Sequence, residues 1–181
     1  MIIGFTGRKQ SGKSTAASAL VQLGYEKRSF AEPLRSMTNE LLLALGLSTA
    51  EIVACHTSKE EVIHPIGVSM RHLLQTLGTD WGRALIDPDL WIKCEQERLE
   101  QVPVEAHLVY DDVRFENEAA LIRAHGGLIV HIRRAGLPAA DAHASEAGIE
   151  VKEGDLVLDN CSNAGALLDA VLALMDRVLV E

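Results

Sequence analysis

GRKQSGKS, residues Gly7 to Ser14, decides the fold, because it matches the phosphate-loop pattern G-x-x-x-x-G-K-[ST] at every fixed position. The apolar run at residues 2–5 predicts a short strand before it. An amphipathic pattern over residues 14–23 predicts a helix after it, ending at Gly24. A strand, a glycine-rich loop and a helix in this order are the structural setting in which the motif binds phosphate.

The chemistry of phosphate binding explains the spacing of this loop. Gly7 and Gly12 allow backbone conformations that other residues avoid, so successive N–H groups can point at phosphate oxygens. We expect Lys13 to bridge the β- and γ-phosphates of ATP and Ser14 to bind Mg²⁺. A solvated position is the alternative for Lys9, since such loops work mainly through their backbone. The residues expected to hold ATP here are Gly7, Lys9, Ser11, Gly12, Lys13, Ser14 and Thr15.

Composition limits the possible partners. The 181 residues are 48% hydrophobic and 24% charged, which is typical of a globular domain with a substantial core. A formal net charge of -9 disfavours a nucleic-acid partner. The three cysteines show no C-x-x-C spacing, which favours a reducing compartment, and no apolar run reaches the length of a membrane span. We therefore expect a cytoplasmic protein that does not bind membranes or nucleic acid; whether it forms a homodimer stays open.

Strands and helices alternate along the chain, which predicts an α/β fold with a parallel sheet covered on both faces. Residues 47–102 interrupt this alternation with helical patterns and are expected to form an insertion, whereas residues 133–145 read as a long functional loop. We expect a single domain over residues 1–181. Further strands are predicted at 25–30, 106–110, 128–132 and 156–158, and further helices at 33–45, 68–77, 81–85, 88–99, 115–125 and 165–179.

Two carboxylates follow the predicted strand that ends at Tyr110. Asp111 and Asp112 lie where ligands gather in α/β sheets, at the carboxyl end of a strand, and Asp112 is expected to support Mg²⁺. Capping of the next helix is the alternative. Trp81 and Trp91 could stack on a base, although core packing is the commoner use of tryptophan.

Several arginines fall in loops or at helix ends of this otherwise acidic chain. The planar guanidinium binds phosphate through two parallel hydrogen bonds and stays charged, so such arginines are candidates for phosphate binding. A solvated surface position is the alternative for each of them. These residues are Arg71, Arg83, Arg114, Arg133 and Arg134.

Longer segments resemble the deoxynucleoside monophosphate kinases of bacteriophages. The resemblance covers nearly the whole chain, and RHLLQTLGTDWGR (71–83) and DVRFENE (112–118) are its most particular segments, beside FAEPLR (30–35) and DPDLW (87–91). It implies a P-loop kinase fold with a five-stranded parallel sheet, a helical acceptor-binding region and a lid over ATP. Transfer of the γ-phosphoryl group of ATP to a deoxynucleoside monophosphate, with Mg²⁺, is the implied reaction. Two alternative functions stay open. Dephosphocoenzyme A kinase is similar in the phosphate loop and the C-terminal region, and a nucleotide-dependent switch is the other alternative.

The resemblance also implies roles for single residues. Catalysis would fall to Lys13, Asp112, Arg114 and Arg133, with Arg134 beside the lid and Asn160 near adenine. His143, Ser145 and Glu146 match the family's H-x-S-E segment. The acceptor would be bound by Phe30, Arg35, Arg71, Gln75, Thr79, Asp80, Arg83, Trp91 and Glu146.

Overall fold

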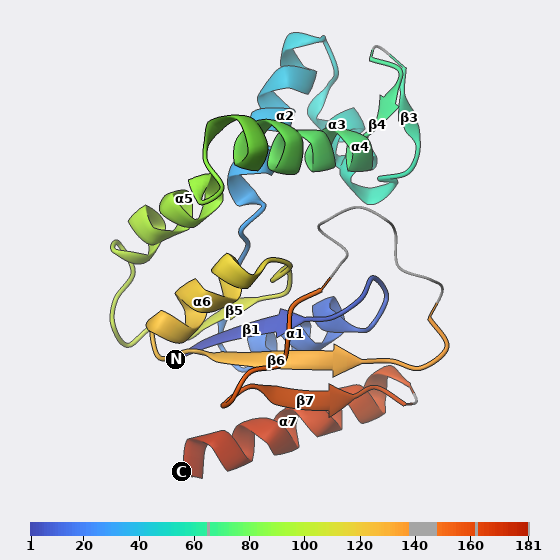
Figure 1. The fold of residues 1–181 in the computed structure, drawn as a ribbon. Helices are drawn as coiled ribbons and strands as arrows, with labels where there is room; N and C mark the ends of the chain where they lie inside the picture. The colour runs from blue at the N-terminus through green and yellow to red at the C-terminus, as the bar shows by residue number, and fades with distance from the viewer. Residues whose placement is uncertain (65, 138–147, 162, 181) are drawn as a thin grey trace. The chain divides into compact units, whose positions relative to one another are not determined.

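The computed structural model describes residues 1–64, 66–137, 148–161 and 163–180 (Figure 1). The chain divides into two compact units. One comprises Met1–Phe30 and Gln96–Glu181, and the other comprises Ala31–Glu95. In the part of the chain that the structure describes, no helix combines the length and apolar character needed to cross a bilayer.

The first unit is built on a five-stranded sheet in which all neighbouring strands are parallel. Its central strand is β1 (Ile2–Thr6), which pairs with β5 on one side and β6 on the other. The predicted α/β fold with a parallel sheet is thereby confirmed. Across the sheet the order is β2 (Glu26–Arg28), β5 (Leu108–Tyr110), β1, β6 (Leu128–Arg133) and β7 (Leu156–Asp159).

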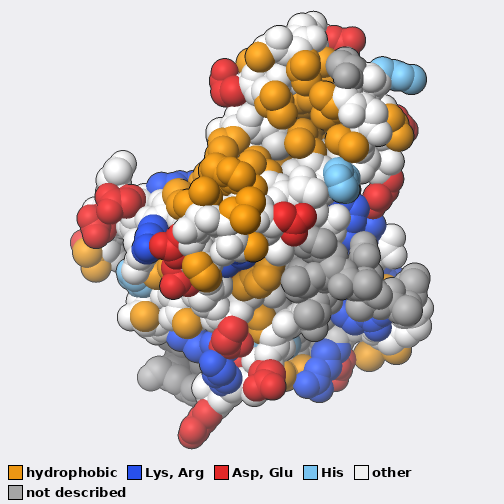
Figure 2. All heavy atoms as spheres, turned by 45° about the horizontal axis from the view of Figure 1, so that its top comes forward, with side chains coloured by type: hydrophobic (Ala, Val, Ile, Leu, Met, Phe, Trp, Pro, Cys, Tyr) orange, Lys and Arg blue, Asp and Glu red, His pale blue; other side chains and the backbone are white. Residues whose placement is uncertain are grey.

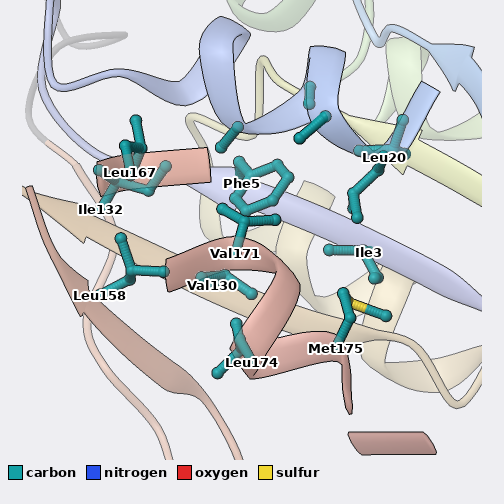
Figure 3. Packing of buried hydrophobic residues seen from close by; sticks show 14 of the residues in the cluster. Ile3, Phe5, Leu20, Val130, Ile132, Leu158, Leu167, Val171, Leu174 and Met175 are labelled. Carbon is teal, nitrogen blue, oxygen red and sulfur yellow. The ribbon is translucent and has the colours of Figure 1, made fainter. Parts of the chain in front are cut away.

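Helices cover both faces of this sheet. Successive residues of β1 point to opposite faces, so each face receives side chains from this central strand. Ile3 and Phe5 belong to the apolar cluster that α1 (Lys13–Gln22) and α7 (Ala164–Val180) form on one face (Figure 3). Gly4 lies between them in sequence, and a Cβ built on it would be 2.6 Å from Ile122 Cδ1 of α6. The close packing of α6 (Glu116–Ala124) on the other face therefore leaves no room for a side chain at Gly4.

The second unit is mostly helical and has its own small core. Leu42, Ile52, Ile63 and Met70 are its buried apolar residues. Its elements in order are α2 (Glu32–Ala44), α3 (Thr49–Thr57), an antiparallel hairpin of β3 (Val62–Ile63) and β4 (Val68–Ser69), α4 (Met70–Gln75), η1 (Thr76–Ile86) and the greater part of α5 (Leu90–Leu99).

The segment η1 is a π-helix, a wide form whose hydrogen bonds reach five residues back. At its end Asp87 N donates to Gly82 O over 2.9 Å. Trp91 packs against this segment: its indole Nε1 donates to Gly78 O over 2.8 Å, and a Cβ on Gly82 would lie 2.3 Å from its ring. The two glycines therefore let the indole approach the helix backbone.

The surface of the helical unit carries many apolar side chains (Figure 2). The exposed Met37 and Leu41 of α2 and Leu45, its C-cap residue, are spaced four residues apart, which places them on one face of the helix. Other large apolar side chains exposed in this unit are Leu43, Val53, Val62, Trp81, Leu85 and Ile86.

The predicted strands and helices of the first unit occur within about two residues of their expected ends, which is the usual scatter of such boundaries. The helical unit begins at Ala31 and so includes α2, which precedes the region 47–102 assigned to the insertion. The β3–β4 hairpin was not anticipated. Of the expected lid 133–145, residues 138–145 lie outside the described part of the chain, as does Glu146.

Candidate active site

The phosphate loop connects β1 to α1 and has the strained backbone that its sequence predicts. Gly7 and Gly12 have φ angles of 138° and 109°, in the region that side chains disfavour. A Cβ on Gly7 would be 2.4 Å from Ile132 O, so the loop also approaches β6 too closely for a side chain there. Gln10, with φ of 65°, is the only non-glycine residue with a positive φ in the described ranges. The loop is therefore tightly wound as well as glycine-rich.

The ammonium group of Lys13 lies at the start of this loop. Its Nζ donates to Gly7 O over 2.6 Å and to Arg8 O over 2.8 Å. The residue is only 9% exposed, although it begins α1. Ser14, the next residue, has an exposed side chain at the same helix end. The start of α1 thus combines the ammonium group of Lys13, which is hydrogen-bonded to the loop, with the hydroxyl group of the exposed Ser14.

Further along the loop, backbone carbonyls accept hydrogen bonds from residues distant in the sequence. Asn160 Nδ2 donates to Ser11 O over 2.8 Å in a buried contact, and Arg134 Nη1 donates to Gln10 O over 3.3 Å. Ser11 itself is buried, and its Oγ has no hydrogen-bond partner among the described residues. The side chain of Asn160, a residue expected near adenine, thus contacts the phosphate loop. Arg133, a residue expected to act in catalysis, is the exposed last residue of β6.

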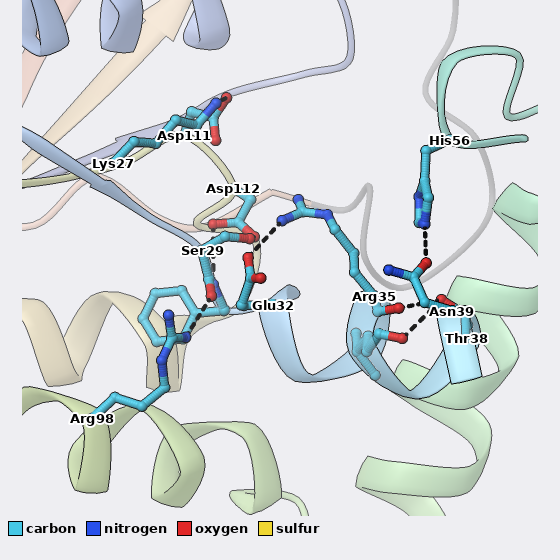
Figure 4. A network of polar contacts seen from close by, with 12 residues as sticks. Lys27, Ser29, Glu32, Arg35, Thr38, Asn39, His56, Arg98, Asp111 and Asp112 are labelled. Carbon is cyan, nitrogen blue, oxygen red and sulfur yellow. Dashed lines mark hydrogen bonds and ion pairs between the residues drawn. The ribbon is translucent and has the colours of Figure 1, made fainter. Parts of the chain in front are cut away.

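The two carboxylates after β5 have defined contacts within the first unit (Figure 4). Asp112 accepts a hydrogen bond from Ser29 Oγ over 2.5 Å and another from Phe30 N over 3.3 Å. Asp111 pairs with Lys27 Nζ over 2.7 Å. These bonds tie the end of β5 to the residues that follow β2, so the carboxylate of Asp112 is held at the carboxyl edge of the sheet.

Glu118 fixes the segment that carries Arg114. This residue is 4% exposed, and its carboxylate accepts from Arg114 N over 2.7 Å and from Phe115 N over 3.1 Å. Both amides lie directly before α6, and an acidic side chain in the first turn also interacts favourably with the helix dipole. Glu118 therefore defines the backbone position of Arg114, a residue expected to act in catalysis.

The arginines of the helical unit have acidic or backbone partners. Arg35 Nη1 lies 3.4 Å from Glu32 Oε2, and Arg71 Nη1 lies 3.8 Å from Glu60 Oε1. Arg83 Nη1 donates to Pro88 O over 3.0 Å. Each of these three arginines is partly buried.

Close to Arg35, His56 Nε2 lies 2.7 Å from Asn39 Oδ1 (Figure 4). Because a carbonyl oxygen only accepts hydrogen bonds, this contact assigns the proton to Nε2. Burial, and then the charges of Lys59 and Arg35, lower the pKa of His56. The imidazole is therefore a neutral donor at physiological pH, and nothing in the sequence singled it out.

The remaining expected acceptor residues differ in accessibility. Trp91 is 3% exposed and Phe30 packs against Tyr110 with ring centroids 5.0 Å apart, so both side chains lie in the interior. Their direct contact with the acceptor stays a prediction. Asp80 is exposed, whereas Gln75 and Thr79 are half-buried.

Comparison with known proteins places these features in a family. The family model described as "Deoxynucleotide monophosphate kinase" matches residues 37–171. A relative from Acanthamoeba polyphaga mimivirus that carries the same family name is 34% identical over 98% of this chain and 97% of its own length. This chain belongs to the deoxynucleotide monophosphate kinase family.

Two further comparisons cover different shares of the matched proteins. The deoxynucleotide monophosphate kinase of Escherichia phage RB69 is 35% identical over 94 residues, which cover 51% of this chain and 38% of the phage protein. The crystal structure of TT1252 from Thermus thermophilus has a TM-score of 0.52 and 20% identity over 99% of this chain and 97% of that one. That second likeness concerns the fold alone.

Proposed function

We propose that this kinase transfers the γ-phosphoryl group of ATP to a deoxynucleoside monophosphate and so forms the diphosphate. The observation that carries the proposal is the complete phosphate loop, in which Lys13 and the N-terminus of α1 lie at the end of the central strand. Family membership supports the use of ATP and of nucleotide substrates. Cytoplasmic location stays a prediction, and whether the kinase forms a homodimer stays open.

The reaction requires alignment and charge neutralisation more than proton transfer. The attacking group is a phosphate oxygen of the acceptor, which is already a competent nucleophile near neutral pH, so no general base is needed. Negative charge spreads over the transferred group in the transition state. In our proposal Lys13, Arg114 and Arg133 stabilise that charge, and Arg134 binds the donor.

The chain offers suitable oxygen donors for Mg²⁺. Ser14 presents its hydroxyl group at the start of α1, and Asp112 is held at the neighbouring strand end. Each carboxylate oxygen of Asp112 accepts one of the two bonds from Ser29 and Phe30, which fixes the carboxylate at that strand end. In our proposal Ser14 binds Mg²⁺ and Asp112 holds a water of its shell. A cation held by these groups would supply positive charge that neutralises the donor phosphates.

We assign acceptor binding to the helical unit. A dianionic phosphate needs cationic partners, and Arg35, Arg71 and Arg83 are partly buried guanidinium groups there. Thr79 and Asp80 lie on the π-helix beside Arg83, a kind of helix that occurs often at functional sites. The proposed set is completed by Phe30, Gln75, Trp91 and Glu146.

An acceptor screen with a coupled ADP assay tests this function. Turnover that requires a deoxynucleoside monophosphate supports it, whereas turnover that requires dephosphocoenzyme A, or slow hydrolysis without any acceptor, contradicts it. Lys13→Ala should lower turnover about 10²-fold or more, because a charge contact to the transition state is lost. Retention of more than about a tenth of the activity by this variant would show that the loop does not act as proposed.

A further inference from the structure

We propose that Asn160 is a positioning residue of the phosphate loop, whose side-chain amide holds the Ser11–Gly12 peptide in its phosphate-binding orientation. This inference rests on the proposed role of Gly7–Ser14 in binding the phosphates of ATP. It differs from the adenine contact that the family resemblance implies, because Asn160 acts here through the loop backbone and independently of the base.

The contact is buried and tightly packed on both sides. Asn160 is 7% exposed, and its Nδ2 donates to Ser11 O over 2.8 Å. A Cβ on Gly12 would lie 2.7 Å from that same Nδ2 and 2.7 Å from Leu167 Cδ2 of α7. The loop backbone is thus in direct contact with the amide, and no side chain at residue 12 could separate them.

Asn160 is itself held by the sheet. Its backbone N donates to Arg133 O over 2.7 Å, directly after the pairing of Arg133 with Asp159 that ends the β6–β7 ladder. The side chain therefore projects from a fixed backbone position at the carboxyl edge of the sheet. A rigid donor at this point can impose an orientation on the loop instead of following it.

The planarity of the peptide group explains why this orientation matters. In a trans peptide the C=O and the following N–H point in opposite directions. Holding Ser11 O toward Asn160 thus directs the N–H of Gly12 to the opposite side, as a loop that cradles phosphate requires. Other carbonyls of the loop are held in the same way: Gly7 O and Arg8 O by Lys13, Gln10 O by Arg134, and Gly12 O by Ala16 N.

The consequence is specific to phosphate binding. Without the amide donor, the Ser11–Gly12 peptide can rotate so that Ser11 O points toward the phosphate site. The carbonyl oxygen then repels the phosphates, and the N–H of Gly12 no longer points at them. A buried hydrogen bond of this kind is worth about a tenfold change in an equilibrium constant. Because the loop contacts phosphates and no base, the loss should be the same for any polyphosphate ligand.

The experiment compares Asn160→Asp with wild-type protein, using calorimetric titration of ATP and of inorganic tripolyphosphate. We expect the dissociation constants of both ligands to rise about tenfold, while the acceptor KM is unchanged. Asn163→Asp is the matched control: Asn163 Oδ1 caps α7 through Ala166 N over 3.0 Å, and aspartate caps a helix equally well. Its dissociation constants should match those of wild type.

Two outcomes would overturn the inference. Weakening that is confined to ATP would identify Asn160 as an adenine contact, and unchanged binding of both ligands would show that the amide does not control the loop. Asn160→Ala, which removes the donor without adding charge, decides the question if Asn160→Asp does not fold. Failure of wild-type protein to bind tripolyphosphate would overturn the phosphate-loop assignment itself, which separates that failure from a failure of the role of Asn160.

Discussion

Replacing Asp155 with Asn should destabilise the first unit in a pH-dependent way. The carboxylate of Asp155 lies in the segment before β7, and its side chain is 2% exposed. Arg123 donates to it through two nitrogens over 2.9 and 2.7 Å, and His131 Nε2 lies 2.9 Å from Oδ2. Lys152 N adds a fourth contact over 2.9 Å.

These contacts determine the size of the expected effect. Burial alone would raise the pKa of Asp155, but the hydrogen bonds from Arg123, Lys152 N and His131 outweigh it and lower the pKa from 3.8 to about 2. At about 1.4 kcal/mol per pKa unit, the ionised group contributes about 2 kcal/mol to the free energy of unfolding at neutral pH. Because the pKa is lower in the folded state, this contribution is present above about pH 4 and is lost as the pH falls toward 2.

The assay is urea unfolding followed by far-UV circular dichroism, from pH 7 down to pH 3. Asp155→Asn should lower the free energy of unfolding at pH 7 by at least about 2 kcal/mol, and the difference from wild type should shrink below about pH 4. Asp169→Asn, on the exposed side of α7, is the control and should stay within about 0.5 kcal/mol of wild type. Equal stability of Asp155→Asn and wild type at pH 7, or a difference that persists unchanged at pH 3, would refute this account.

Two further predictions concern the substrates. Asp112→Asn should raise the Mg²⁺ concentration needed for half-maximal rate severalfold. An unchanged Mg²⁺ titration would show that Asp112 has a structural role, through contacts such as those with Ser29 and Phe30, and does not support Mg²⁺. Arg71→Lys and Arg83→Lys keep the charge but lose the two-pronged guanidinium, so steady-state kinetics should show acceptor KM raised about tenfold with ATP KM unchanged. Arg177→Lys, exposed on α7, should alter neither constant; loss of ATP binding in the first two variants would contradict the acceptor assignment.

The sheet and its phosphate loop could be predicted because their signals are local. Three signals follow one another between Ile2 and Gln22: the apolar run of β1, the loop motif and the amphipathic pattern of α1. Each of these signals depends on side-chain spacing alone. The helices α2, α6 and α7 ended near their expected positions for the same reason.

Parts of the helical unit could not be predicted in this way. The strands of the hairpin, Val62–Ile63 and Val68–Ser69, contain two residues each, which is too short for alternation to show. The π-helix Thr76–Ile86 packs against Trp91 at Gly78 and Gly82, and Trp91 lies outside that helix. Such packing overrides local helical preference and leaves no periodic signal.

In the candidate site, the sequence indicated residue types better than their contacts. Asn160 was recognised as a site residue, but its bond to Ser11 joins positions 149 residues apart. Glu118 belongs to a recognised segment, yet its role in fixing Arg114 N depends on the turn at the start of α6. The Asn39–His56 contact joins two helices and had no sequence signal at all.

In the acceptor site that we propose, the glycines of the π-helix limit which positions could be redesigned. A Cβ on Gly82 would overlap the indole of Trp91, and one on Gly78 would lie 3.1 Å from Leu34 Cδ1. A mutant library over this segment should therefore leave both glycines unchanged and diversify Thr79, Asp80 and Arg83. Selection from such a library would then report changes in ligand preference instead of enriching clones that merely retain a folded helical unit.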